Sequence, residues 1–331
     1  MKSIEVYFNF IINNIELIYT HMIIKKEKKG DVMVYYVDKD YDDDKMEKKL
    51  DKKLKRDDVK VIIDHDADVF TNDDKLLIRF RKDKLKQANI DDFYDNVIKF
   101  AQSKTQNRGS AAGSKKKINK FNPKIMTNIL GYFDKLTPNQ KVIFKEKGKA
   151  LPKITVRETR FNMDYPDKFK KLVPLIKEID HYYEKYAPSH YAEQRKKANQ
   201  TPFKIPGTAF TTVTTNVNWQ TAVHTDKGDD PDGFGNLVVI EEGKYKGGET
   251  CLPQYGIGVD VRTGDVLYMD VHQPHGNLPL ELESPDAKRL SVVCYLRKSI
   301  WDQTKNKTRK FLDSQNSLIR SLRTKKNRPK K

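Results

Sequence analysis

The sequence predicts an α+β protein whose second half is a strand-rich sandwich or barrel, preceded by helical and further β-rich segments. From about residue 207, short runs of β-branched and apolar residues follow one another between Gly, Pro and Asp turns, with no helical pattern between them. Residues 166–188 instead carry apolar side chains at helical spacing. Residues 1–100 alternate short apolar runs with charged ones. This mixture predicts flanking helices and an N-terminal β-rich extension beside one strand-rich core.

The N-terminal part begins with an apolar but interrupted segment, MKSIEVYFNFIINNIELIYTHMII. Acidic and amide residues break it and it has no small-residue cleavage site, so we expect a buried strand or helix and no signal peptide. The runs DVMVYYV and KVIIDHDADVF predict strands, and the charged run between them predicts an exposed helix or a mobile loop. The Gly-, Ser- and Lys-rich stretch 103–120 predicts a loop.

The clearest helix is expected between Pro166 and Pro188. Its apolar residues near helical spacing are Phe169, Leu172, Leu175, Ile176, Ile179 and Tyr183. The later strand-like segments are AFTTVTTNVNW, GNLVVIEEG, GIGVDVRTGDVLYMDV and RLSVVCYLR. We therefore expect three parts: an α/β extension of unknown role over 1–100, a main domain over 101–300 with its β core at about 205–297, and a basic tail over 301–331.

The charge of the chain favours a polyanionic partner. There are 64 Lys and Arg against 46 Asp and Glu, a net charge of +18, and residues 302–331 alone hold 11 basic and 2 acidic residues. A second basic stretch lies at 115–124. Nucleic acid is the first partner such a balance suggests and an anionic membrane the second. The alternative is a lysine-rich composition with solvated tails.

Compartment and assembly follow from simpler features. No run of about 18 apolar residues is present, so no transmembrane helix is expected. The two cysteines, Cys251 and Cys294, form no CxxC pair, which fits a reducing compartment and excludes a cysteine-only zinc site. We expect a soluble, intracellular monomer, with the nucleus and the cytoplasm of a virus- or phage-infected cell as equally compatible locations.

His224 and Asp226 suggest a metal site at a strand end. One residue separates them, and side chains two apart on a strand project from the same face. Non-haem Fe(II) oxygenases bind iron through two histidines and one carboxylate, which leaves positions for a co-substrate and O2. A third ligand must then come from a distant strand. Both His272 and His275 follow the strand DVLYMDV; we take His275, at a hairpin rim before Gly276, and assign His272 to the surroundings of the metal or the substrate.

A carboxylate clamp is expected on the next strand. Arg289 follows His275 by 14 residues and opens RLSVVCYLR, and Ser291 points to the same side. A guanidinium binds a carboxylate through two parallel hydrogen bonds, which suits the distal carboxylate of 2-oxoglutarate. A His-x-Asp pair alone is a weak signal that often marks a polar turn. The combination predicts a catalytic 2-oxoglutarate site, with an inert cupin-like β-helix or another metal as the alternatives.

These residues resemble the TET/JBP oxygenases, especially the thymine hydroxylases and their viral and phage relatives. The resemblance rests on TAVHTDKGDDPDGFGNLVVI, GGETCLPQYGIGVDVRTGDVLYMDVHQPHGNLPL and RLSVVCYLR, and covers about 205–297, with weaker similarity at 107–113, 130–134 and 158–162. It implies a double-stranded β-helix (jelly-roll or cupin-like), Fe(II) held by His224, Asp226 and His275, and 2-oxoglutarate held by Arg289 and Ser291. With O2, such an enzyme would hydroxylate the 5-methyl group of a pyrimidine in DNA.

The same resemblance suggests further contacts. Asp229 stands three positions after Asp226, where the family has a residue that contacts the base; capping the turn is the alternative. Arg108 is a candidate for a second 2-oxoglutarate or phosphate contact. Phe210, Trp219 and Phe234 are candidates for holding a base that has left the stack, although for each of them a place in the core is the preferred interpretation.

The substrate stays open at this point. The methylcytosine branch of the family carries a cysteine-rich zinc-binding extension that two cysteines cannot build, which favours thymine over 5-methylcytosine. Two other functions remain: a 2-oxoglutarate-dependent hydroxylase of a protein or small molecule, and a non-catalytic DNA-binding protein with a relic site.

Overall fold

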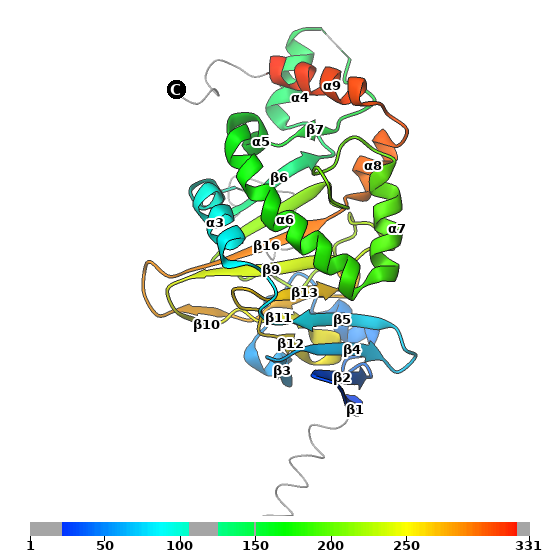
Figure 1. Cartoon of the computed structure of the whole chain (residues 1–331), viewed down its shortest axis with the longest axis vertical. Helices are drawn as coiled ribbons and strands as arrows, with labels where there is room; N and C mark the ends of the chain where they lie inside the picture. The colour runs from blue at the N-terminus through cyan, green and yellow to red at the C-terminus, as the bar shows by residue number, and fades with distance from the viewer. Residues whose placement is uncertain (1–21, 106–124, 149, 323–331) are drawn as a thin grey trace, which may run out of the picture.

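The chain is described by a computed structural model over residues 22–105, 125–148 and 150–322. Two β-sheets carry the fold (Figure 1). The large sheet has, in spatial order, β1 (Ile23–Lys29), β2 (Val32–Val37), β4 (Ala67–Thr71), β5 (Leu76–Arg81), β13 (Val266–Met269), β9 (Gly235–Glu242), β16 (Lys288–Tyr295), β8 (Thr212–Val217), β6 (Thr127–Phe133) and β7 (Arg157–Glu158). The small sheet has β14 (Gly276–Asn277), β11 (Thr250–Leu252), β12 (Ile257–Val259) and β3 (Val61–Ile63). A separate ribbon pairs β10 (Tyr245–Gly247) with β15 (Leu280–Leu282).

The strand predictions in the second half are confirmed. Each of the four predicted segments contains strand residues, and between 212 and 297 the described structure has no helix beyond the 3-10 turn Pro253–Tyr255. In the long central strands, Val, Thr and Ile line up across β8, β16 and β9 in antiparallel register. β16 is paired on both sides, and most of its residues are buried. β16 therefore lies inside the large sheet and forms part of one wall of the space between the sheets.

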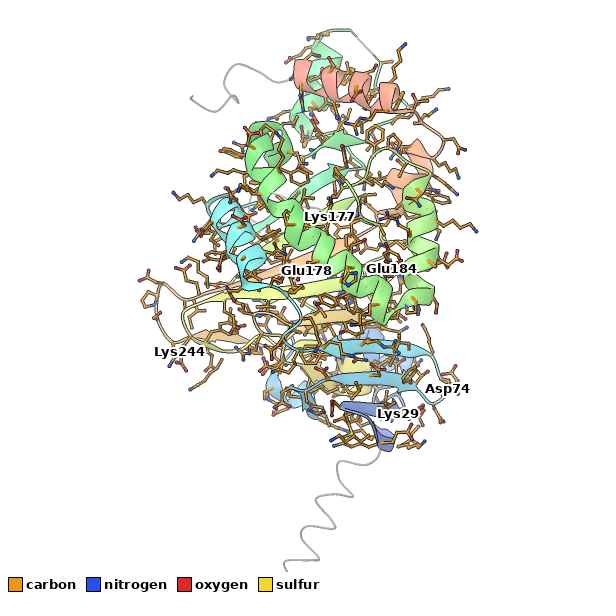
Figure 2. The ribbon with its side chains drawn as sticks, in the orientation of Figure 1. Lys29, Asp74, Lys177, Glu178, Glu184 and Lys244 are labelled. Atoms are coloured by element: carbon orange, nitrogen blue, oxygen red, sulfur yellow. The ribbon has the colours of Figure 1, made fainter. Side chains whose placement is uncertain are left out.

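Helices cover one face of the large sheet. They are α3 (Gln87–Ala101), α5 (Arg160–Asp164), α6 (Pro166–Tyr186) and α7 (Pro188–Asn199), and in Figure 1 α6 crosses in front of the central strands. The predicted helix is therefore confirmed as α6. In its apolar stripe Leu172, Ile176 and Tyr183 are fully buried and Phe169 is half-buried, while Lys177 and Glu184 lie on the outer side of the helix (Figure 2).

The strands before residue 100 belong to the same two sheets. β5 pairs antiparallel with β13, with Phe80 opposite Leu267, and β3 pairs parallel with β12, with Ile62 opposite Gly258. One apolar cluster also joins the two parts, since Phe80 packs in the same core as Leu267. The charged run before β3 holds only the short helix α2 (Asp43–Glu47) and the 3-10 turn Arg56–Asp58. Where a domain boundary lies stays a prediction, but these strands complete the sheets around the site.

The C-terminal residues are folded as far as Leu322. After β16 come α8 (Lys298–Thr304) and α9 (Arg309–Ser321), and Thr308 caps α9 by accepting a hydrogen bond from the Phe311 N–H. Leu322 and Ile319 pack against Phe144 of α4 (Pro138–Glu146), and Figure 1 shows α4 and α9 together at one end of the molecule. Part of the predicted basic tail is thus a packed helix. Residues 1–21, 106–124 and 323–331, including Arg108 and the second basic stretch, lie outside the described residues.

Candidate metal centre and substrate cavity

His224 and His275 face each other across an antiparallel backbone bridge. The N–H of His224 donates to the carbonyl of His275 at 2.9 Å, and the N–H of His275 donates to the carbonyl of His224 at 2.8 Å. Directly opposed residues of such a pair project their side chains to the same side. The two imidazole rings accordingly lie 4.4 Å apart between centroids. Two histidines 51 positions apart in sequence are thereby fixed as neighbours.

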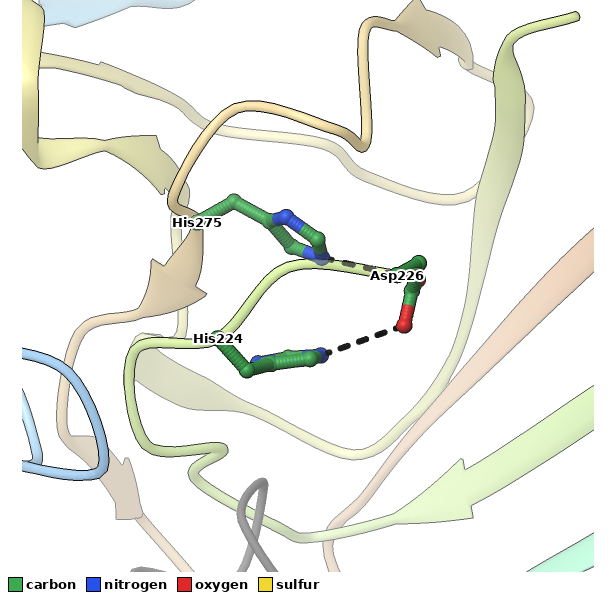
Figure 3. A group of neighbouring side chains, drawn as sticks. All are labelled: His224, Asp226 and His275. Atoms are coloured by element: carbon green, nitrogen blue, oxygen red, sulfur yellow. Dashed lines mark ion pairs between the residues drawn. The ribbon is translucent and has the colours of Figure 1, made fainter. Parts of the chain in front are cut away.

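Asp226 completes the group (Figure 3). Its Oδ1 lies 3.7 Å from Nε2 of His224 and its Oδ2 lies 3.6 Å from Nε2 of His275. One ligand atom from each of the three residues lies within 4.8 Å of the others, a spacing that can hold a metal ion. The Asp226 backbone is also fixed, because its N–H donates to the carbonyl of Val271 at 3.0 Å.

The donor set fits a divalent transition metal. Nδ1 of His224 lies 2.8 Å from the carbonyl of Ala222, and Nδ1 of His275 lies 2.9 Å from the carbonyl of Gln273. A carbonyl only accepts, so Nδ1 carries the hydrogen in both rings and Nε2 presents its lone pair to the centre of the group. Burial opposes protonation of His275, but the Asp226 carboxylate outweighs it and raises the pKa of His275. A cation placed between the three side chains would supply the positive charge that this carboxylate attracts.

The group opens into a cavity of about 290 Å³ between the two sheets. The large sheet contributes one wall through alternate residues of β16 and the segment after it. They are Arg289, Ser291, Val293, Tyr295 and Arg297. The small sheet and the loops contribute the other wall, including Thr250, Gly276 and Asn277. Trp219, one of the three aromatic candidates, also lines the cavity.

Arg289 and Ser291 lie in this wall beside the metal group. Arg289 is 6% exposed, and its backbone N–H donates to Oδ1 of Asn218 at 2.7 Å. Ser291 Oγ accepts a hydrogen bond from Nδ2 of Asn216 at 3.2 Å. Both side chains line the same cavity as the three candidate metal ligands, so the carboxylate-binding pair expected from the sequence is geometrically available.

Asp229 lies in the cavity wall and in a turn at once. Its N–H donates to the carbonyl of Asp226 at 3.2 Å, and its backbone pairs with that of Arg297. The side chain is among those that line the cavity, and the residue is 8% exposed. Both interpretations of Asp229, turn former and substrate contact, are therefore compatible with its position.

Two expected substrate contacts lie outside the cavity lining. Nε2 of His272 is turned away to the carbonyl of Asp230, at 3.1 Å. Phe234 is 4% exposed and packs against His190, with ring centroids 3.9 Å apart, while its N–H donates to the hydroxyl of Tyr183. Phe210 is likewise fully buried in the helix-facing core. For Phe234 and Phe210 the core interpretation is the correct one, because both side chains pack among apolar neighbours on the side of the sheet that the helices cover.

Sequence reasoning missed Arg297. Its Nε donates to Oδ1 of Asp134 at 2.7 Å, and its guanidinium stacks over the ring of Phe133 at 4.7 Å. Burial opposes its charge, but Tyr295 and Asp134 outweigh that effect and raise the pKa of Arg297. The signal was present: counting by twos from Arg289 along the predicted strand RLSVVCYLR reaches position 297, two residues beyond the end of β16. Sequence reasoning also did not single out Asn216, Asn277 and Tyr295, which line the same cavity.

Part of the chain is similar to known oxygenase domains. Residues 142–298 match the Tet_JBP family, the oxygenase domain of the 2OGFeDO superfamily. The bifunctional helicase and thymine dioxygenase JBP2 of Leishmania braziliensis is 36% identical over 172 residues, 52% of this chain and 14% of that protein. The thymine dioxygenase JBP1 of Trypanosoma brucei brucei is 31% identical over 175 residues, 52% of this chain and 20% of that protein. The chain thus spans a fifth or less of the length of these relatives.

A solved structure shares the fold. The structure of NgTET1 in complex with 5mC DNA superposes with a TM-score of 0.50 at 14% sequence identity, covering 79% of this chain and 88% of that one. The expected double-stranded β-helix with flanking helices is therefore confirmed. Among the described residues, no helix has the length and apolar character needed to cross a membrane.

Proposed function

We propose that this chain is an Fe(II)- and 2-oxoglutarate-dependent dioxygenase that hydroxylates the 5-methyl group of a pyrimidine in DNA, a proposal supported by the match of residues 142–298 to the oxygenase domain of the Tet_JBP family. One observation carries the proposal. A His-Asp-His group with both imidazole Nε2 atoms turned inward shares a single cavity with a buried arginine. This is the arrangement that an iron ion and an α-keto acid co-substrate need side by side.

His224, Asp226 and His275 would hold the Fe(II). When bound there, Fe(II) together with 2-oxoglutarate and O2 supplies the oxidising chemistry that hydroxylation of a methyl group requires. Arg289 would bind the distal carboxylate of 2-oxoglutarate through its two-pronged guanidinium, with Ser291 donating from the same face of the strand. The hydrogen bond from Asn216 leaves the Ser291 hydroxyl hydrogen available to a carboxylate.

The far end of the cavity would receive the base. A methyl group inside a stacked duplex cannot reach a metal enclosed by two sheets, so the nucleotide must be flipped out or single-stranded. Asp229 can accept a hydrogen bond from a ring N–H or an exocyclic amine, and Arg297 can donate to a carbonyl or a phosphate. Thymine and 5-methylcytosine both offer such groups. We propose thymine as the first substrate to test.

DNA is the proposed partner. The net charge of +18 would supply affinity for phosphates that does not depend on sequence and weakens with salt. We propose that the chain acts on DNA as a monomer, with its cavity accepting one nucleotide.

The decisive experiment follows nucleosides and succinate together. The chain is incubated with Fe(II), 2-oxoglutarate and DNA containing either thymine or 5-methylcytosine, and nucleosides are measured by mass spectrometry. We expect hydroxymethyl product and DNA-stimulated succinate formation, both absent in Asp226→Ala. The proposal is wrong if the chain binds metal but DNA of neither kind stimulates turnover. Stimulation by a peptide panel alone would point to a protein hydroxylase instead.

A further inference from the structure

Asp270 lies at the start of the loop that carries His275, and it is nearly enclosed. The residue is 4% exposed, yet it has no ligand role and does not line the cavity. Its Oδ1 accepts a hydrogen bond from the His272 N–H at 3.0 Å, and its Oδ2 accepts one from Nε2 of Gln273 at 3.1 Å. The N–H of Gln273 donates to the carbonyl of Asp270 at 3.2 Å. One carboxylate therefore organises the backbone of the loop 270–273.

The same short loop orients two candidate metal ligands. The carbonyl of Gln273 receives the Nδ1 hydrogen of His275 at 2.9 Å. The carbonyl of Val271 receives the backbone N–H of Asp226 at 3.0 Å. A shift of this loop by a fraction of an ångström would therefore move both ligands, because their orientation depends on carbonyl groups within it.

A lysine from the N-terminal part of the chain holds Asp270. Nζ of Lys75 lies 2.7 Å from Oδ2 of Asp270, with the lysine side chain 54% exposed and the aspartate side chain 6% exposed. Lys75 lies at the turn between β4 and β5, next to Asp74, which is labelled there in Figure 2. The N–H of Asp270 donates to the carbonyl of Leu77 at 2.9 Å, so both backbone and side chain join the loop to this hairpin.

The N-terminal part also touches the segment before His224. The N–H of Asp51 donates to the carbonyl of Val223, and the N–H of Val223 donates to the carbonyl of Lys52, each at 2.8 Å. Residues 51–77 therefore support both ligand-bearing segments, although the matched family domain begins only at 142. Of these contacts, the ion pair between Lys75 and Asp270 is the one that involves a buried charge.

We infer that Asp270, held by Lys75, is a positioning residue for the metal ligands His275 and Asp226. The inference rests on the proposed function for the identity of the ligands. Without the lysine, the buried carboxylate keeps only the two loop donors and draws in water; without the carboxylate, the loop loses its organising acceptor. Either substitution should weaken metal binding, although neither residue contacts the metal or the substrate.

The test measures binding of Co(II) to the metal-free full-length chain by calorimetry and by visible absorption. We expect Asp270→Asn to weaken Co(II) binding about tenfold, as loss of a residue that supports a ligand typically does. Lys75→Ala should weaken it several-fold, Lys75→Arg should restore it, and the double variant should be no weaker than Asp270→Asn, because both act through one interaction.

The matched control is Lys60→Ala. Lys60 pairs with Asp40 in the same part of the chain, with the lysine side chain 37% and the aspartate side chain 12% exposed, and this ion pair does not include a residue of the loop 270–273. If Asp270→Asn and Lys75→Ala bind Co(II) as the natural chain does, or lose no more than Lys60→Ala, the inference is wrong even if Tm falls. If the natural chain itself binds no Co(II), the proposed metal site fails first.

Discussion

Gly248 lies against the side chain of Arg289. A methyl group at position 248 would come within 3.0 Å of both Cδ and Nε of Arg289, and Gly248 also has a positive φ of +79°. The side chain of Arg289, which we propose binds 2-oxoglutarate, therefore packs closely against Gly248, where glycine leaves room for it. A larger residue at position 248 should therefore displace Arg289 within the cavity.

Gly248→Ala should raise KM for 2-oxoglutarate about tenfold or more, because a displaced guanidinium loses its paired hydrogen bonds to the carboxylate. KM for DNA should change little. Steady-state kinetics with 2-oxoglutarate and DNA varied separately would measure both. Gly30→Ala is the control for backbone strain alone, since Gly30 has φ +62° with nothing within 4 Å. Equal effects of the two variants on KM would contradict the packing argument.

His275→Ala should abolish Co(II) binding and turnover, while His272→Ala should keep most of both. The reason is orientation: Nε2 of His275 is turned to Asp226, whereas Nε2 of His272 is turned to the carbonyl of Asp230. Calorimetric titration of each variant with Co(II) distinguishes them. Loss of metal binding in His272→Ala, with His275→Ala intact, would reverse the ligand assignment.

Asp229→Asn separates the two roles of Asp229. Asparagine forms such turns as well as aspartate, so the free energy of unfolding should change by less than about 1 kcal/mol. A base contact would be altered, because the amide brings a donor where the carboxylate only accepts. We expect kcat/KM for DNA to fall roughly tenfold or more with KM for 2-oxoglutarate unchanged. Unchanged kcat/KM for every DNA substrate would leave Asp229 as a turn residue only.

Glu241 makes stability depend on acid pH. Its carboxylate accepts from the Thr263 N–H at 2.8 Å and from Nη1 of Arg262 at 3.1 Å. Burial acts to raise the pKa of Glu241, but these partners outweigh it and lower the pKa below the ordinary 4.5. A depressed carboxyl pKa adds stability that is present above about pH 4.5 and is lost as pH falls through the folded-state pKa.

Glu241→Gln should therefore be less stable than the natural chain at pH 7, and the difference should shrink as the pH is lowered through this window. Urea unfolding at a series of pH values measures it. A difference that is constant from neutral to acid pH would mean that the charge of Glu241 contributes nothing.

The parts of the site that could be predicted are those written in local patterns. His224 and Asp226 are two apart on an extended segment, and Arg289 and Ser291 repeat that spacing, so a period of two was enough to place each pair on one face. The contact between the pairs could be expected only because several strands with no intervening helix must pack together. Asp229 was found through resemblance and not through spacing.

What could not be predicted depends on pairing across long stretches of chain. Nothing local to Leu76–Arg81 indicates that it pairs with β13, nearly 190 residues later, or that Lys75 meets Asp270. Phe234 illustrates a local ambiguity. Its place after the ligand motif allowed either a substrate contact or a core position; the residue directly precedes β9, and its side chain packs in the helix-facing core.

The cavity wall built on β16 has a consequence for how such a protein can vary. Five alternate residues from Arg289 to Arg297 face the cavity, and β16 is hydrogen-bonded to β9 and β8 on its two sides. Because β16 has no unpaired edge, a bulge could not easily absorb an inserted or deleted residue. The residues that line the cavity would instead face the core, and Val292 and Cys294 would face the cavity. Substitutions along this strand can retune the site one position at a time, but a change in its length would exchange the whole wall at once.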